Sequence, residues 1–131
     1  MNLYPNGYNM GMSNSLKPLY WVGSSKKDLM SLPELVRDVF GYALHLSQDG
    51  KKHAQAKPLK GFGGAGVLEV VEDHLGNTYR AVYTVKLADG VYVLHCFQKK
   101  STSGIATPKP DMDLIHERLR VAYKHAKGNG K

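Results

Sequence analysis

Side chains suited to catalysis lie in two neighbouring segments that alternate apolar and polar residues, Thr78 to Leu87 and Val91 to Lys99. This alternation predicts two β-strands. A two-residue turn at Ala88-Asp89 would join them as an antiparallel hairpin and pair Arg80 with Phe97. Because side chains alternate between the two faces of a strand, one face then carries Phe97 together with three basic side chains. These are Arg80, His95 and Lys99, with Lys86 further along the same face.

Such a face suits a strand of RNA, because an aromatic ring can stack on a base while the cations hold phosphate. Cleavage by the 2′-hydroxyl needs a base, positive charge for the phosphorane and an acid for the departing 5′-oxygen. His95 can exchange protons near neutral pH, and Arg80 supplies fixed charge and paired donors. A register slip of one residue would instead set Gln98 and Lys100 beside Arg80.

Each of these residues also has a purely structural interpretation. His95 can be an ordinary surface or core histidine, and Lys99 a solvated strand end. Arg80 can form a surface ion pair with Glu69 or Glu72, which would contribute little to stability. The other histidines lack the spacing of metal ligands, so we expect neither a metal nor a cofactor.

Composition and charge favour a nucleic-acid partner. The chain has 131 residues and a formal net charge of +7, and its one cysteine, Cys96, excludes an intramolecular disulfide. We expect a cytoplasmic protein, since no apolar run is long enough to cross a membrane and no secretory signal is evident. The most basic segment holds four lysines and no acid, and we expect it to contact nucleic-acid phosphate without taking part in chemistry. These lysines are Lys51, Lys52, Lys57 and Lys60.

The remaining patterns predict a single domain over residues 17–127, between a disordered tail at 1–16 and a short tail at 128–131. Met1 and Met12 are alternative starts. We expect strands at Leu19–Val22 and Val67–Asp73 beside the hairpin, a short helical turn from Lys26, and helices from Leu32 to Ser47 and after Pro110. Apparent capping boxes begin at Ser25 and Ser31, and Asp111 is the expected cap of the last helix. The order predicts an α+β fold: a small, mostly antiparallel sheet with helices packed on one face and the other face open to a ligand.

Four segments resemble, in the same order, the phage-derived HigB-like branch of the RelE/ParE toxin superfamily. They are GVLEVVED (Gly66 to Asp73), YRAVYTV (Tyr79 to Val85), VYVLHCFQKKS (Val91 to Ser101) and TPKPDMDLIHERL (Thr107 to Leu119). The resemblance spans Lys17 to about Lys127. It implies a compact toxin of a type II toxin–antitoxin system that cleaves messenger RNA on the ribosome. Its antitoxin would be a small helix-turn-helix protein encoded beside it.

The resemblance also implies roles for individual residues. Arg80 matches the strand arginine that acts on the scissile phosphate, and Lys99 matches a second basic residue. His95 and Lys100 belong to the H-x-F-x-K-K signature. Where RelE carries lysines in the preceding strand, this chain has acids at Glu69, Glu72 and Asp73. Tyr123 and His125 are therefore candidates for proton transfer.

Two alternatives stay open. The same fold includes ParE toxins, which bind DNA gyrase and cut no RNA, and fold alone does not choose between the two activities. The chain can also be an inactive, RNA-binding remnant of a mobile element.

Overall fold

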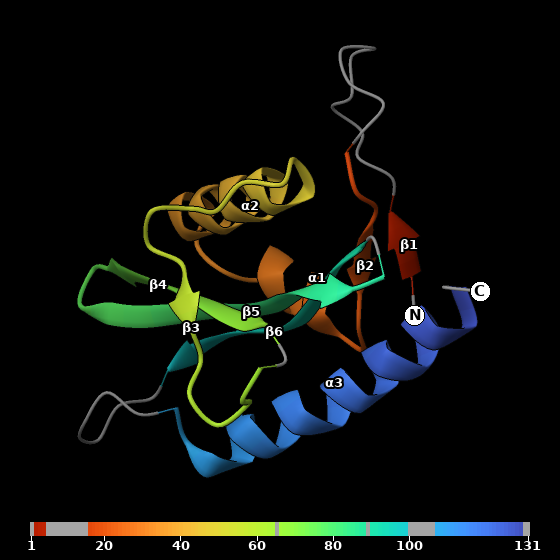
Figure 1. The fold of residues 1–131 in the computed structure, drawn as a ribbon. Coiled ribbons are helices and arrows are strands. Elements are labelled where there is room, and N and C mark those ends of the chain that lie inside the picture. The colour runs from red at the N-terminus through yellow and green to blue at the C-terminus, as the bar shows by residue number, and fades with distance from the viewer. Residues whose placement is uncertain (1, 5–15, 65, 89, 100–106, 130–131) are drawn as a thin grey trace.

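A computed structural model describes residues 2–4, 16–64, 66–88, 90–99 and 107–129 (Figure 1). It contains a six-stranded sheet in the order β1-β2-β6-β5-β4-β3, with helices packed against it. The strands are β1 (Asn2–Tyr4), β2 (Leu19–Trp21), β3 (Lys57–Pro58), β4 (Val67–His74), β5 (Asn77–Leu87) and β6 (Gly90–Lys99). The helices are α1 (Ser25–Met30), α2 (Glu34–Gln48) and α3 (Lys109–Asn129). The α+β class and the mostly antiparallel sheet are confirmed. Among the strands that the structure describes, only β2 and β6 pair in parallel.

The register of the β5–β6 hairpin is confirmed where it matters for the site. Leu87 pairs with Gly90 across the turn, and Arg80 pairs with Phe97. Between these pairs the register shifts at Val82/Tyr83 and shifts back before the turn, an irregularity that the alternation did not predict. The preceding hairpin turns at Leu75 and Gly76, which both have positive φ values, 51° and 81°. A two-residue turn of this kind matches the right-handed twist of the strands that it joins.

Two strands lie in segments for which none was expected. β1 pairs with β2 and falls within the segment predicted to be a tail; residues 1 and 5–15 of that tail lie outside the described residues. β3 forms inside the lysine-rich segment and pairs antiparallel with β4. Both strands are short, and the sequence of neither shows an extended alternation.

One face of the sheet packs against α2, as expected. Val36, Phe40 and Ala43 on α2 are fully buried and belong to one apolar cluster with Tyr83 and its neighbours. Val85 packs against the same cluster, so the alternation assigned Tyr83 and Val85 to the correct face of β5. The same alternation predicts Leu87 on that face, but Leu87 belongs to the cluster on the other side of the sheet, because the register shifts between Thr84 and Leu87.

The other face is not open, and here the prediction of helices on one face only is wrong. Helix α3 crosses it on the side opposite α2 (Figure 1). Ile115, Leu119 and Ala122 of α3 join Val82 and Leu94 in a second apolar cluster. The physical reason lies in β6, which is buried continuously from Val91 to Phe97. A strand that is apolar on both sides needs a layer on each face.

The expected helix caps also differ from those observed. Helix α2 follows Pro33, and no side chain caps its first turn. Ser31 instead donates its hydroxyl to the carbonyl oxygen of Asp28, 2.7 Å away. Helix α3 begins at Lys109, so Asp111 lies inside its first turn rather than before it. The carboxylate of Asp111 is thereby free of a capping role and points to the sheet.

Candidate active site

The hairpin brings four predicted site residues to the face beneath α3. Arg80 and Phe97 are directly paired, and His95 and Lys99 lie on either side of Phe97 along β6. All four are buried, with Arg80 and His95 each 6% exposed and Lys99 7% exposed. The structure therefore confirms that these side chains share a face. On this face Thr107 contacts Arg80, and Asp111 of α3 contacts His95. Lys100, the alternative neighbour of Arg80, lies outside the described residues.

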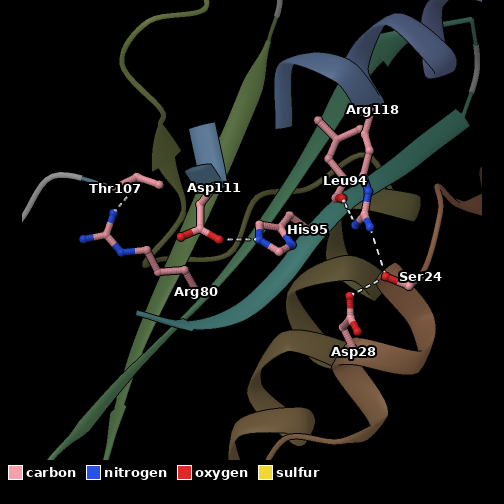
Figure 2. A network of polar contacts seen from close by, with 8 residues as sticks. All are labelled: Ser24, Asp28, Arg80, Leu94, His95, Thr107, Asp111 and Arg118. Carbon is pink, nitrogen blue, oxygen red and sulfur yellow. Dashed lines mark hydrogen bonds and ion pairs between the residues drawn. The ribbon is translucent and has the colours of Figure 1, made fainter. Parts of the chain in front are cut away.

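His95 is held by a partner that the sequence analysis had assigned to a helix cap. Its Nε2 lies 2.8 Å from Oδ1 of Asp111, which descends from the first turn of α3 (Figure 2). The imidazole also stacks on the ring of Phe97, with 4.2 Å between ring centres and 13° between planes. Its second nitrogen, Nδ1, is buried and has no hydrogen-bond partner among the described residues.

The pKa of His95 is lowered from its ordinary 6.5 because burial disfavours the charged ring. The hydrogen bond and negative charge of Asp111 oppose this effect without cancelling it. At neutral pH the ring is therefore uncharged, with its proton on Nε2 and directed to the carboxylate of Asp111. Nδ1 is then left with a lone pair, which makes it a proton acceptor.

Arg80 is engaged in a buried ion pair instead of a surface one. Its Nη1 donates to Oε1 of Glu69 at 2.8 Å and to the hydroxyl of Thr107 at 2.9 Å. The side chains of Arg80 and Glu69 are 7% and 8% exposed. The pairing with Glu69 was one of the structural interpretations that the sequence offered. Because the pair is buried, removing either partner would leave an uncompensated charge inside the protein.

A second polar network ties α3 to the start of α1 (Figure 2). Arg118 donates to the carbonyl oxygen of Leu94 at 2.8 Å and to the hydroxyl of Ser24 at 3.0 Å. Ser24 in turn donates to Asp28 at 2.7 Å. Gly23 permits this approach: a Cβ there would lie 2.9 Å from Nε of Arg118. The network fixes α3 beside His95, which is the residue immediately after Leu94.

A cleft reaches His95 from the side of α1. It has a volume of about 650 Å³ and runs along β6 beyond the end of β2. Its lining includes Asp28, Ser31, Tyr79, His95 and Phe97. A ligand in this cleft would meet the edge of the imidazole–phenyl stack.

The two C-terminal candidates for proton transfer lie elsewhere. Nδ1 of His125 is 2.8 Å from the hydroxyl of Tyr92, and burial raises the pKa of Tyr92 to about 12, so Tyr92 stays protonated. Tyr123 is 46% exposed on the outer side of α3. Both residues come more than three helical turns after Asp111, or about 20 Å along the axis. The structure does not bring them to Arg80 or His95.

The basic residues outside this site divide between two surfaces. The four lysines of segment 51–60 are exposed, and Lys51 pairs with Asp49 at 3.1 Å. They are Lys51, Lys52, Lys57 and Lys60. Lys86 is exposed beside the C-terminal half of α3.

The described part of the chain contains neither a cluster of metal-ligand side chains nor a helix suited to crossing a membrane. No three histidine, cysteine, aspartate or glutamate side chains are grouped there as metal ligands would be. None of its helices combines the length and apolar character that crossing a membrane requires.

The sequence profile of a family described as phage-derived Gp49-like proteins (DUF891) matches residues 27–120. The chain belongs to this Gp49-like family. The match runs from α1 to the middle of α3 and includes Arg80, His95 and Asp111. No curated protein matches the chain. Within this Gp49-like protein, the His95–Asp111 pair is the arrangement best suited to chemistry.

Sequence reasoning missed Asp111 as a site residue although a signal was present. Asp111, Ile115, Leu119 and Ala122 follow one another at helical spacing, so the aspartate shares the apolar face of α3. A carboxylate on a buried helix face requires a polar partner. The histidine on the apolar strand β6 is that partner.

Proposed function

We propose that this Gp49-like protein is the toxin of a type II toxin–antitoxin system and inhibits translation by cleaving messenger RNA on the ribosome. The observation that carries the proposal is the His95–Asp111 pair: His95 lines a cleft, and its buried Nδ1 has no hydrogen-bond partner among the described residues. A substrate must therefore displace what covers Nδ1 before this nitrogen can accept a proton. The resemblance of four segments to HigB-like toxins and the phage-derived family support the same conclusion.

In the proposed reaction, Nδ1 of His95 takes the proton from a 2′-hydroxyl as that oxygen attacks the adjacent phosphorus. The phosphorane then expels the 5′-oxygen, which takes a proton from water, and the protonated His95 returns its own proton to water. The products are a 2′,3′-cyclic phosphate on one fragment and a 5′-hydroxyl on the other. Asp111 is a positioning residue, because it holds the ring in the tautomer whose lone pair is on Nδ1. The nucleophile belongs to the substrate, so the route needs no metal ion.

Arg80 and Lys99 would supply positive charge to the phosphorane. The guanidinium of Arg80 already binds one anionic group, the carboxylate of Glu69. A substrate phosphate would compete with that carboxylate, and the fork of Arg80 favours an anion with paired oxygens. Phe97 would support the imidazole, since one face of its ring is occupied by His95.

The proposed partners are the ribosome, its messenger and an antitoxin encoded beside the gene. The four lysines of segment 51–60 would contact ribosomal RNA, where phosphate contacts position a protein without chemistry.

A second candidate function is a toxin that binds a protein such as DNA gyrase and cleaves nothing. The burial of Arg80, His95 and Lys99 favours it, since no more than 7% of any of them is exposed. A binder of this kind needs no basic site beneath α3.

One pair of assays separates the two functions. Purified protein is added to a translating extract, and the messenger is mapped by primer extension; the same protein is added to a gyrase supercoiling reaction. We expect new messenger 5′ ends within ribosome-covered sequence and unchanged supercoiling. Inhibited supercoiling with intact messenger would establish the second function instead.

A further inference from the structure

The outer side of α3 carries a basic surface that the proposed chemistry does not use. Lys86 at the end of β5 and Lys124 and Lys127 on α3 surround a hollow of about 460 Å³, together with Tyr123. We call these four residues the basic groove. Its floor contains the apolar side chains of Leu87, Ala88 and Ala126.

The groove combines elements distant in sequence. Tyr123 and Lys127 are one helical turn apart and face the same way, and Arg120 continues the exposed basic surface one turn earlier. Lys86 comes from the other side of the hollow. Its stem crosses Gly66 so closely that a Cβ on this glycine would lie 2.5 Å from Cγ of Lys86. The stem of Lys86 thus lies close to the backbone of Gly66.

The cations of the groove are available for a partner. Lys86, Lys124 and Lys127 make no ion pair with a carboxylate among the residues described. Earlier on the same helix, Lys109 is neutralised by Asp113 at 2.9 Å. Cations near a helix C-terminus are favourable in themselves. That effect does not explain a third lysine from β5, nor an aromatic ring that is 46% exposed.

We propose that the basic groove binds single-stranded RNA through its phosphate backbone, with Tyr123 stacked on an unpaired base. Proteins commonly bind single-stranded nucleic acid with basic side chains along its phosphate backbone and an exposed aromatic ring that stacks on a base. A membrane surface fits less well, because interfacial helices need a broad apolar face and that of α3 packs on the sheet. This inference rests on the proposed function for its choice of RNA. The groove is about 20 Å along α3 from Asp111, so it would hold the messenger away from the bond that is cut.

The test measures binding of the full-length protein to an unstructured RNA oligonucleotide by fluorescence anisotropy, over a series of salt concentrations. Removing two phosphate contacts by Lys124→Gln with Lys127→Gln should lower the slope of log K against log salt by about 1.4. Lys86→Gln should remove about 0.7 more. The matched control, Lys17→Gln with Lys27→Gln, removes the same charge elsewhere and should change the slope by less than half as much.

Tyr123 gives a second and independent readout. Tyr123→Ala should weaken RNA binding roughly tenfold at every salt concentration, and Tyr123→Phe should retain it, since stacking needs only the ring. Equal effects of the groove and control variants would overturn the proposal, as would binding to anionic phospholipid vesicles in preference to RNA. Failure of the proposed function gives a different result from failure of the basic groove. If only the proposed function fails, the wild-type protein leaves the messenger intact, while the groove substitutions still weaken RNA binding.

Discussion

Nε2 of His95 and Oδ1 of Asp111 lie 2.8 Å apart, although one residue is on the central strand β6 and the other on the first turn of α3. The contact joins the sheet to the helix that covers it, and it leaves Nδ1 of the ring as the proton acceptor. The proposed chemistry depends on this geometry, so the first prediction concerns Asp111.

Asp111→Asn should lower the rate of messenger cleavage by about a hundredfold or more, because an amide can donate to Nε2 and so select the wrong tautomer. The rate is measured by primer extension on ribosome-bound messenger. Asp113→Asn is the matched control: it lies on the same helix, its ion pair with Lys109 is exposed, and its rate should stay at the parental value. Equal rates for the two variants would remove Asp111 from the site.

The pH dependence follows from the lowered pKa of His95. Cleavage needs the neutral ring, so the rate should be level above about pH 6.5 and fall only as the pH approaches the lower folded pKa. Asp111 raises that pKa, so Asp111→Asn should move the acid limb to still lower pH. If the acid limb of the rate–pH profile lies at the same pH in Asp111→Asn as in the wild type, a group other than His95 is titrating.

The same pKa shift makes a prediction about stability. Below its ordinary pKa of 6.5 the unfolded chain binds a proton at His95 that the folded protein does not. Stability should therefore fall as the pH drops from 6.5 to the folded pKa, and the loss should end below it. The measurement is the urea concentration at the midpoint of unfolding, plotted against pH for the wild type and His95→Gln. Over that pH range the midpoint should change less with pH in the variant than in the wild type.

Arg80→Ala should slow cleavage strongly and also destabilise the protein, since it leaves the carboxylate of Glu69 buried without its arginine. The expected losses are roughly a hundredfold in rate and about 3–5 kcal/mol in the free energy of unfolding. Adding Glu69→Gln to Arg80→Ala should recover much of the stability and none of the rate. Recovery of both together would show that Arg80 acts only through the fold.

The position of α3 is tested by a pair of substitutions on that helix. Ile115 is fully buried and Val121 is 43% exposed. Ile115→Ala should lower the free energy of unfolding by about 2–5 kcal/mol. Val121→Ala should change it by no more than about 0.5 kcal/mol. Chemical denaturation followed by circular dichroism measures both. Similar values for the two would contradict the packing of α3 on the sheet.

The sequence predicted the hairpin and its register because both depend on local patterns. Alternation along β5 and a two-residue turn are sufficient to pair Arg80 with Phe97. The same reasoning did not reveal the covered face, since β5 alone carries polar residues there. The signal was in β6, whose apolar residues continue from Val91 to Leu94 without alternation. Such a run indicates a strand buried on both faces.

The candidate site was predictable only in part. Arg80, His95 and Lys99 share a face as expected, but their contacts with Asp111, Glu69 and Thr107 depend on packing between segments distant in the chain. The buried pairing of Arg80 with Glu69 also required β4 to align with β5, a register that the residue pattern leaves open. The resemblance alone suggested proton-transfer roles for Tyr123 and His125. The geometry does not support these roles, since both residues lie toward the end of α3 that is distant from Asp111.

The central claim is that His95 removes the proton from the 2′-hydroxyl, and single-turnover cleavage by His95→Gln tests it most directly. Ribosomes loaded with a defined messenger are mixed with excess protein, and the fragments are followed with time. A folded His95→Gln protein should cut at least about a hundredfold more slowly while binding the ribosome as the wild type does. Cleavage by this variant at the parental rate, with the same fragments, would contradict the account.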